Sequence, residues 1–136
     1  MLSRLDGTLV AVDRAAVTSS PLAHARRLAD LTNSTVLLKG ATTLVVCPDS
    51  SGLAVRSQAD APPWLATAGS GDVLAGLAGM LLASGLSAQD SGSVAALVHG
   101  LAAKAANPGG PVRALAVAHA IPGVIAALMV RRTARS

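Results

Sequence analysis

Residues 65–76 read Leu-Ala-Thr-Ala-Gly-Ser-Gly-Asp-Val-Leu-Ala-Gly, a glycine-rich turn directly before an apolar segment with helical periodicity. Glycine adopts backbone angles that a side chain forbids, and it lets a ligand approach the main chain closely. The first N–H groups of the helix have no internal partners and lie at the positive end of its dipole. We therefore expect an anion-binding turn, or anion hole, formed by Gly69, Ser70 and Gly71.

Asp72 is the charged residue of this turn, and residues 61–130 contain only three other charged side chains. Its carboxylate can accept the proton of a hydroxyl that is being phosphorylated, while the N–H groups of the turn hold the charge on the transferred group. A bare Gly-x-Gly-Asp pattern has a simpler interpretation, because tight turns with a capping aspartate are common. The pattern by itself leaves both interpretations of Asp72 open.

A helix and two strands are predicted before the turn. Ser20 and Pro21 are typical of a helix start, and the apolar residues of 21–31 recur at helical spacing. Residues 35–38 and 43–47 are short apolar runs that predict buried strands. A helix, a short turn and a buried strand in succession indicate a parallel α/β sheet.

The chain between these strands and the turn predicts a hairpin and a loop. Residues 48–52 combine proline, aspartate, serine and glycine, which favours a turn after the second strand. Residues 53–56 are then the return strand of a hairpin. Residues 57–63 show no periodicity and contain two consecutive prolines, so we expect a loop.

Helices are predicted from the turn to the end of the chain. Residues 73–89 and 114–130 carry no formal charge, which raises the possibility of membrane spans. Both are short for a spanning helix and contain glycine, serine, histidine or proline, so we expect buried helices of a soluble α/β protein and no membrane association. Ser87 and Asp90 have the spacing of a capping box, which predicts that a helix begins at this point.

The composition limits the class of protein. A chain of 136 residues is long enough for one core, so we expect residues 1–136 to form a single domain. Apolar residues make up 51% of it and Trp64 is the only aromatic side chain, which predicts an aliphatic core.

The net charge of +4 comes from scattered basic residues, and without a basic face and stacking aromatics we expect no nucleic acid partner. Cys47 is the single cysteine, so no internal disulfide is possible. No secretory pattern opens the chain, and we therefore expect a cytoplasmic location.

Residues 65–76 resemble the signature of the NAD(P)H-hydrate dehydratases, a ribokinase-like family that repairs hydrated nicotinamide cofactors. Residues 36–43 resemble the family's strand and Lys-Gly-Ala-x-Thr segment, where the adenine nucleotide binds, and residues 99–102 are similar to its His-Gly-x-Ala helix. The resemblance implies an α/β chain, the C-terminal portion of a ribokinase-like three-layer α/β/α fold. That portion has parallel strands, a β-hairpin and then a run of helices.

The resemblance also implies roles for individual residues. Nucleotide contacts are assigned to Lys39, Gly40, Ala41, Thr42, Thr43 and Gly71. Asp72 is the catalytic base that faces the hydroxyl of NAD(P)H hydrate. Similar enzymes use ADP or ATP, with Mg²⁺, to phosphorylate that hydroxyl, and then eliminate phosphate to restore NADH or NADPH. Judged from the residues alone, Lys39 is equally well a surface lysine, and His99 is expected to pack on an apolar helix face.

Family members are longer, and their first half supplies further parallel strands. Residues 1–5 resemble the stretch just after a His-x-Gly-Glu segment of the family. We therefore expect the chain to be unstable unless another polypeptide supplies those strands, and to be a homo-oligomer when folded. Two other functions stay open. One is a kinase for a vitamin or sugar hydroxyl, because a Gly-x-Gly-Asp turn serves dehydratases and kinases alike. The other is a truncated, non-catalytic nucleotide-binding fragment.

Overall fold

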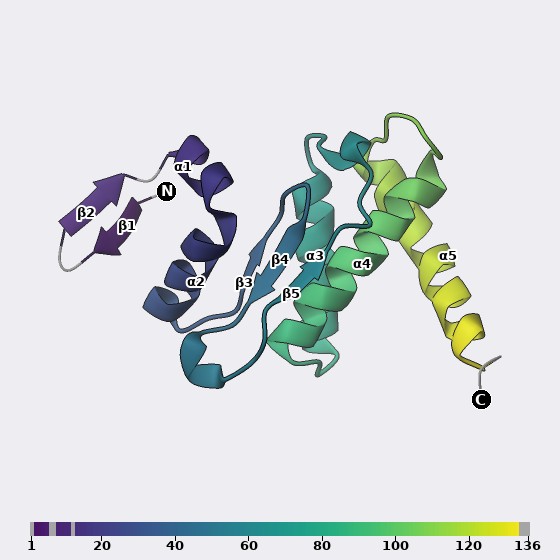
Figure 1. Ribbon diagram of the computed structural model, residues 1–136. Helices are drawn as coiled ribbons and strands as arrows, with labels where there is room; N and C mark the ends of the chain where they lie inside the picture. The colour runs from purple at the N-terminus through teal and green to yellow at the C-terminus, as the bar shows by residue number, and fades with distance from the viewer. Residues whose placement is uncertain (1, 6–7, 12, 134–136) are drawn as a thin grey trace. The chain divides into compact units, whose positions relative to one another are not determined.

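The computed structural model describes residues 2–5, 8–11 and 13–133 (Figure 1). The chain divides into two compact units, Met1–Ser57 (unit 1) and Gln58–Ser136 (unit 2). All five described strands begin within unit 1, and the three long helices that follow the glycine-rich turn lie in unit 2. The change from α/β to helical structure thus coincides with the boundary between the units.

Unit 1 begins with a strand pair and a short helix that the sequence patterns did not predict. β1 (Leu2–Leu5) pairs antiparallel with β2 (Thr8–Ala11). The helix α1 (Arg14–Ser19) follows. Asp13 caps it, because its carboxylate Oδ1 accepts a 2.7 Å hydrogen bond from the N–H of Ala16.

The helix α2 (Pro21–Thr32) packs on a three-stranded sheet and confirms the predicted helix at residues 21–31. The sheet order is β3 (Val36–Leu38), β4 (Thr43–Val46) and β5 (Arg56–Gln58). Ala25 and Ala29 of α2 are buried against Val46 of β4, and aliphatic side chains surround this cluster. Small alanine side chains on the buried face allow the helix backbone to lie close to the sheet.

The pairing of β3 with β4 corrects two predictions. The two strands are antiparallel, with Val36 opposite Val46 and Leu38 opposite Leu44, so the parallel pairing expected here is wrong. Only residues 39–42 connect them, and a parallel pair needs a much longer crossover connection. In addition, β3 is half-buried rather than buried, whereas β4 is largely buried.

The return strand of the predicted hairpin also lies further along the chain. The 3₁₀ helix η1 (Asp49–Ser51) and Gly52, whose φ is 65°, take up the turn, and residues 53–55 stay outside regular structure. β5 therefore occupies Arg56–Gln58 instead of residues 53–56, and the predicted loop begins two residues later. Asp30 of α2 secures η1, since its Oδ1 accepts a 2.7 Å hydrogen bond from Asp49 N–H.

Unit 2 consists of the 3₁₀ helix η2 (Pro63–Leu65) and three helices, α3 (Ser70–Ala83), α4 (Ala88–Ala106) and α5 (Ala114–Thr133). α4 contacts both α3 and α5. Its predicted cap is confirmed, because Ser87 Oγ accepts a 3.1 Å hydrogen bond from Asp90 N–H. The buried hydrophobic residues of unit 2 are aliphatic, as predicted, and one cluster of them consists of Leu65, Ala102, Ala103, Val112 and Val117.

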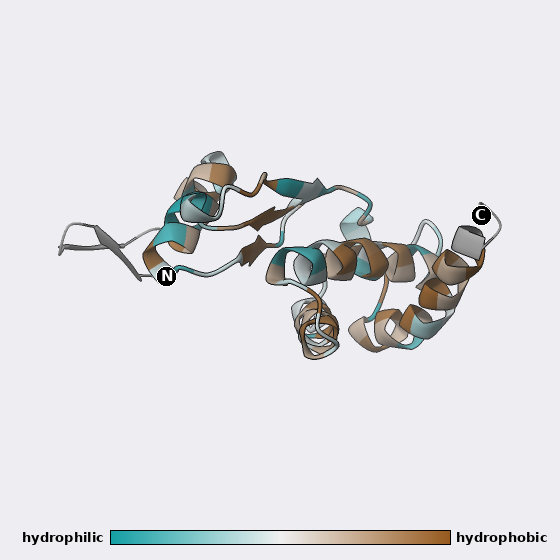
Figure 2. Ribbon diagram, turned by 90° about the horizontal axis from the view of Figure 1, so that it is seen from below, coloured by the Kyte–Doolittle hydropathy of each residue, from teal (hydrophilic) through white to brown (hydrophobic). Residues whose placement is uncertain are grey.

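The two uncharged segments form α3 and α5 and differ in burial. None of the helices in the described ranges combines the length and the hydropathy needed to cross a bilayer. Within α3, Leu74 and Leu77 are buried. Of residues 114–130 only Val117 is buried, and Met129 is 67% exposed, so the prediction of a buried helix is wrong for α5. Hydrophobic residues are frequent along α5 (Figure 2).

Candidate functional site

The glycine-rich turn forms the start of α3, as predicted. Gly69 is the N-cap residue and takes a φ of 79°, in the left-handed region that favours glycine. Its carbonyl accepts hydrogen bonds from the N–H groups of Asp72 at 3.2 Å and Val73 at 3.3 Å. The N–H of Gly71 has no acceptor in the part of the chain that the structure describes. The turn therefore presents a backbone donor at the positive end of a 14-residue helix.

Ser70 stabilises the turn through its side chain. Its hydroxyl is buried and donates a 2.8 Å hydrogen bond to the carbonyl of Leu65 in η2. Its N–H donates to the carbonyl of Thr67 at 3.3 Å. Of the three residues in the predicted anion hole, Ser70 thus has its polar groups engaged within the protein, and Gly71 has its N–H available.

Asp72 does not cap the helix. The N-cap position belongs to Gly69, and Asp72 lies within the first turn of α3, where its negative charge is favoured by the helix dipole. Its side chain is exposed, and no described residue makes an ion pair or a side-chain hydrogen bond with it. The interpretation of Asp72 as a simple N-cap is therefore wrong, and its carboxylate is available to accept a proton.

The two glycines of the turn have different surroundings. A Cβ atom at Gly69 would lie 3.2 Å from the Cβ of Ala114, the first residue of α5, so this side of the turn is closed by packing. A Cβ atom at Gly71 would meet no other atom within 4 Å. Gly71 is exposed, with open space on the side where a side chain would stand.

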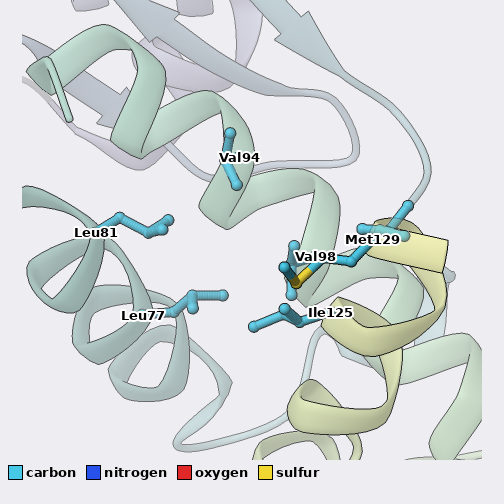
Figure 3. Close-up of a pocket in the computed structure, with 7 residues that line it drawn as sticks. Leu77, Leu81, Val94, Val98, Ile125 and Met129 are labelled. Atoms are coloured by element: carbon cyan, nitrogen blue, oxygen red, sulfur yellow. The ribbon is translucent and has the colours of Figure 1, made fainter. Parts of the chain in front are cut away.

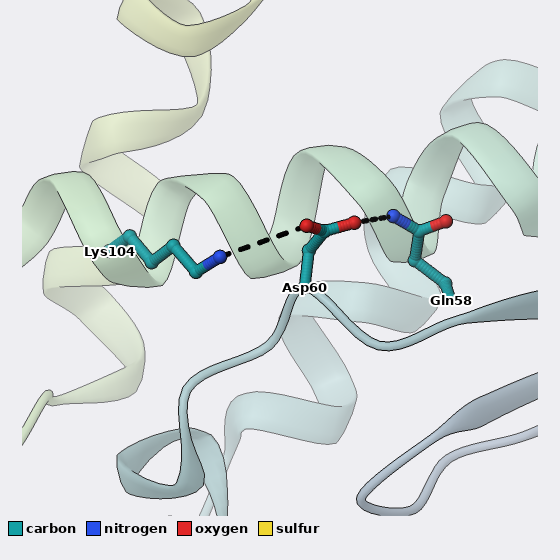
Figure 4. A network of polar contacts seen from close by, with 3 residues as sticks. All are labelled: Gln58, Asp60 and Lys104. Atoms are coloured by element: carbon teal, nitrogen blue, oxygen red, sulfur yellow. Dashed lines mark hydrogen bonds and ion pairs between the residues drawn. The ribbon is translucent and has the colours of Figure 1, made fainter.

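The segment before the turn is held against α4 at the predicted His-Gly motif. Gly100 faces the backbone of the loop, because a Cβ atom there would lie 3.1 Å from the nitrogen of Ala61. Asp60 strengthens this contact through an ion pair with Lys104 of α4 at 3.8 Å, and it also accepts a hydrogen bond from Gln58 (Figure 4). The glycine of the motif is therefore required for packing.

His99 confirms the prediction that it packs within α4. Its side chain is only 2% exposed. It belongs to the buried face of the helix, together with alanine and valine residues. The motif formed by His99 and Gly100 thus supports the approach to the turn and is removed from solvent.

Unit 1 contains a cavity at the predicted nucleotide-binding segment. Lys39, Gly40, Ala41 and Thr42 form the connection between β3 and β4, and all four line a cavity of about 340 Å³. This volume falls in the range of small-molecule pockets. Thr43 is buried at the start of β4 and is not among the lining residues.

Five further residues line this cavity, and none of them was predicted as a site residue. They come from α1, the start of α2 and the two strands: Val17, Thr18, Pro21, Leu38 and Leu44. The side chains of this set are apolar apart from the Thr18 hydroxyl. No local motif marks Val17 or Thr18, because only folding brings α1 next to the β3–β4 connection.

A second cavity, of about 240 Å³, lies in unit 2 (Figure 3). It is lined by aliphatic and methionine side chains of α3, α4 and α5: Leu77, Leu81, Val94, Val98, Ile125, Leu128 and Met129. These side chains offer no hydrogen-bonding group that could orient a polar substrate. This cavity is therefore not a candidate for the chemistry of the turn.

A metal site is not apparent at the turn. Across the described residues, no group of three or more histidine, cysteine or acidic side chains is placed to hold a metal ion. Asp72 is the only carboxylate of the turn. Mg²⁺ in nucleotide sites is usually held by one or two carboxylates together with substrate phosphates, so the single carboxylate of the turn is compatible with the Mg²⁺ that the resemblance implied.

Curated relatives agree with the sequence resemblance. The bifunctional NAD(P)H-hydrate repair enzyme Nnr of Mycobacterium leprae is 42% identical over 109 residues, which cover 79% of this chain and 21% of the relative. The ADP-dependent (S)-NAD(P)H-hydrate dehydratase of Neisseria meningitidis is 42% identical over 101 residues, which cover 74% of this chain and 32% of the relative. The chain therefore spans between about a fifth and a third of the length of these relatives.

A solved structure confirms the predicted α/β fold class. YxkO of Bacillus subtilis matches with a TM-score of 0.73 at 21% sequence identity, covering 83% of this chain and 42% of YxkO. The chain thus corresponds to part of a larger α/β fold. The family model described as NAD(P)H-hydrate dehydratase matches residues 3–122, which is most of the sequence. The chain belongs to the NAD(P)H-hydrate dehydratase family.

Proposed function

We propose that this chain acts in the ADP-dependent dehydration of NAD(P)H hydrate, which restores NADH or NADPH. The observation that carries the proposal is the turn at the start of α3, where the Asp72 carboxylate is exposed and unpaired among the described residues. The adjacent Gly71 is exposed, and its N–H has no acceptor among the described residues. The relative from Neisseria meningitidis, named for this reaction and for its dependence on ADP, supports the assignment.

The chemistry requires two steps. Asp72 accepts the proton of the hydrate's hydroxyl, and the hydroxyl oxygen attacks the terminal phosphoryl group of the nucleotide. The bond between this phosphoryl group and the rest of the nucleotide breaks, and the nucleotide leaves one phosphate shorter. The phosphorylated oxygen then leaves carbon as phosphate with its bonding electrons. A proton is lost from the neighbouring carbon, and the carbon–carbon double bond of the nicotinamide ring is restored.

Backbone donors at the turn favour the first step. Negative charge develops on the equatorial oxygens of the transferred phosphoryl group, and a preorganised N–H beside a helix N-terminus stabilises that charge. Ser70 holds the turn in place through its buried hydrogen bond to Leu65. We propose that Gly71 supplies the donor and Asp72 the base.

The cavity of unit 1 supports the nucleotide-binding role assigned to the β3–β4 connection. Lys39 brings positive charge to its rim, Thr42 brings a hydroxyl, and Gly40 and Ala41 keep the main chain accessible. We propose that Lys39, Gly40, Ala41, Thr42 and Thr43 belong to the adenine nucleotide site. Thr43, which is buried, takes part by fixing the start of β4.

Turnover by the purified chain tests the proposal. Incubation with hydrated NADH and ADP should restore the absorbance of the nicotinamide ring, and ATP serves as the parallel nucleotide. Asp72→Asn should lower the rate by at least about 100-fold, the scale of general base catalysis, while calorimetry shows ADP binding unchanged. Full activity of the Asp72→Asn variant would contradict the assignment of the base.

Two other outcomes point to the alternative functions. ADP binding without any turnover favours a non-catalytic nucleotide-binding module, in keeping with the limited share of the relatives that the chain covers. Phosphorylation of a vitamin or sugar hydroxyl, with no action on the hydrate, favours a small-molecule kinase.

We also propose that the chain acts in the cytoplasm and assembles as a homo-oligomer. Large apolar side chains on α5 support association, since Leu115, Met129 and Val130 are each 67% exposed. Light scattering of the purified chain across a range of concentrations measures the oligomeric state, and a monomer at every concentration would contradict this part of the proposal.

A further inference from the structure

The cavity at the β3–β4 connection has a second wall, formed by α1 and the start of α2. Val17, Thr18 and Pro21 lie on this wall, and residues 38–42 and 44 line the rest of the cavity. Trp64, the only aromatic residue in the sequence, is not among the lining residues. The cavity therefore offers a ligand aliphatic side chains to pack against, and no aromatic one.

Thr18 contributes a hydroxyl whose hydrogen is already committed. Its Oγ1 donates a 2.8 Å hydrogen bond to the carbonyl of Arg14, one turn earlier in α1. A hydroxyl has one hydrogen to donate and two lone pairs that accept. Within the cavity, Thr18 can therefore accept a hydrogen bond from a ligand but cannot donate one without breaking its bond to Arg14.

We propose that Thr18 is a specificity-determining residue, which selects a purine base with an amino group at its sixth position over one with a carbonyl group there. An amino group donates to the Thr18 oxygen, whereas a carbonyl oxygen would face the lone pairs of that oxygen. Val17 and Pro21 supply the apolar surface against which the base lies. This inference rests on the proposed function, because it places the base of the same nucleotide.

The chain offers a matched control for Thr18. Thr32, at the end of α2, has the same local geometry, with its Oγ1 donating a 2.7 Å hydrogen bond to the carbonyl of Leu28, and it is also exposed. It does not line the cavity. A Thr→Val change at either position removes one backbone-bonded hydroxyl on the last turn of a helix, so only the Thr18 change alters the cavity.

The test is calorimetric binding of ADP and of inosine diphosphate to the wild-type chain and to the variants Thr18→Val, Thr18→Ser and Thr32→Val. We expect the wild type to bind ADP about 2- to 10-fold more tightly than inosine diphosphate, the range of one net hydrogen bond. Thr18→Val should bind the two nucleotides equally through weaker ADP binding. Thr18→Ser, which keeps the hydroxyl, and Thr32→Val should both retain the preference.

The outcomes separate this inference from the function on which it rests. ADP binding with no preference in the wild type, or with the same preference in Thr18→Val, overturns the role of Thr18 and leaves the proposed function standing. Absence of binding of either nucleotide to the wild type overturns both. If circular dichroism shows that Thr18→Val does not fold, Thr18→Ser and Thr18→Ala are compared instead. The role of Thr18 is supported when Thr18→Ser retains the preference for ADP over inosine diphosphate and Thr18→Ala loses it.

Discussion

Gly100 provides the sharpest test of how the approach to the turn is held in place. An alanine at this position would place its Cβ 3.1 Å from the nitrogen of Ala61, 3.2 Å from its Cα and 3.2 Å from the carbonyl carbon of Asp60. All three atoms belong to the backbone, so a side-chain rotation cannot relieve the contact. Gly76 in α3 is the matched control, because a Cβ there meets nothing within 4 Å.

Both substitutions gain helix propensity, and only one creates a steric conflict. Replacing a helical glycine by alanine stabilises a helix by about 0.8–1 kcal/mol. Insertion of a methyl group into a well-packed contact costs about 1–3 kcal/mol. We therefore expect Gly76→Ala to raise the free energy of unfolding by up to about 1 kcal/mol. Gly100→Ala should be less stable than Gly76→Ala by about 1–3 kcal/mol.

Fluorescence of Trp64 during unfolding in urea measures this difference. Trp64 is the only aromatic residue of the chain, lies in η2 a few residues after Ala61, and is 49% exposed. Its emission therefore reports on the unfolding of unit 2, to which it belongs. If Gly100→Ala raises the urea midpoint as much as Gly76→Ala does, the close packing of the loop on α4 is refuted.

Two further predictions concern the contacts around the turn. Ser70→Ala should lower the free energy of unfolding by about 1–3 kcal/mol, because it removes the buried hydrogen bond to the Leu65 carbonyl. Ser84→Ala is the control, because the similar hydrogen bond of Ser84 is exposed, and it should change the free energy of unfolding by less than about 0.5 kcal/mol. Urea titration measures both values. Lys104→Met should lower the free energy of unfolding by less than about 1 kcal/mol, since the ion pair of Lys104 with Asp60 is half exposed. Thermal unfolding should show that the difference in stability from the wild type shrinks in high salt. A larger loss of stability that does not depend on salt would contradict this prediction.

Local signals in the sequence predicted the elements that depend on neighbouring residues. Pro21 predicted the start of α2, and Ser87 with Asp90 predicted the capped start of α4, because capping involves groups within one helical turn. The Gly69 to Asp72 segment predicted the start of α3 for the same reason. One local signal was overlooked: Asp6-Gly7, a frequent hairpin dipeptide, stands in the sequence between β1 and β2.

Predictions that needed contacts between distant segments were less successful. The periodicity of β3 and β4 could not give their relative direction, and the four residues between them were the better guide, since so short a connection requires an antiparallel pair. The absence of charge in α5 suggested burial, yet Met129 and Val130 are exposed, because burial depends on the neighbours that the fold supplies.

The sequence by itself determined the family, the position of the glycine-rich turn and the residue types available for proton transfer, since these depend on residues that are adjacent in the chain. Tertiary structure alone decided that Gly100 accommodates the backbone of Ala61 and that Thr18 lines the cavity beside Lys39. These relations arise between segments far apart in sequence, where packing geometry sets which atoms meet and no local pattern records the outcome.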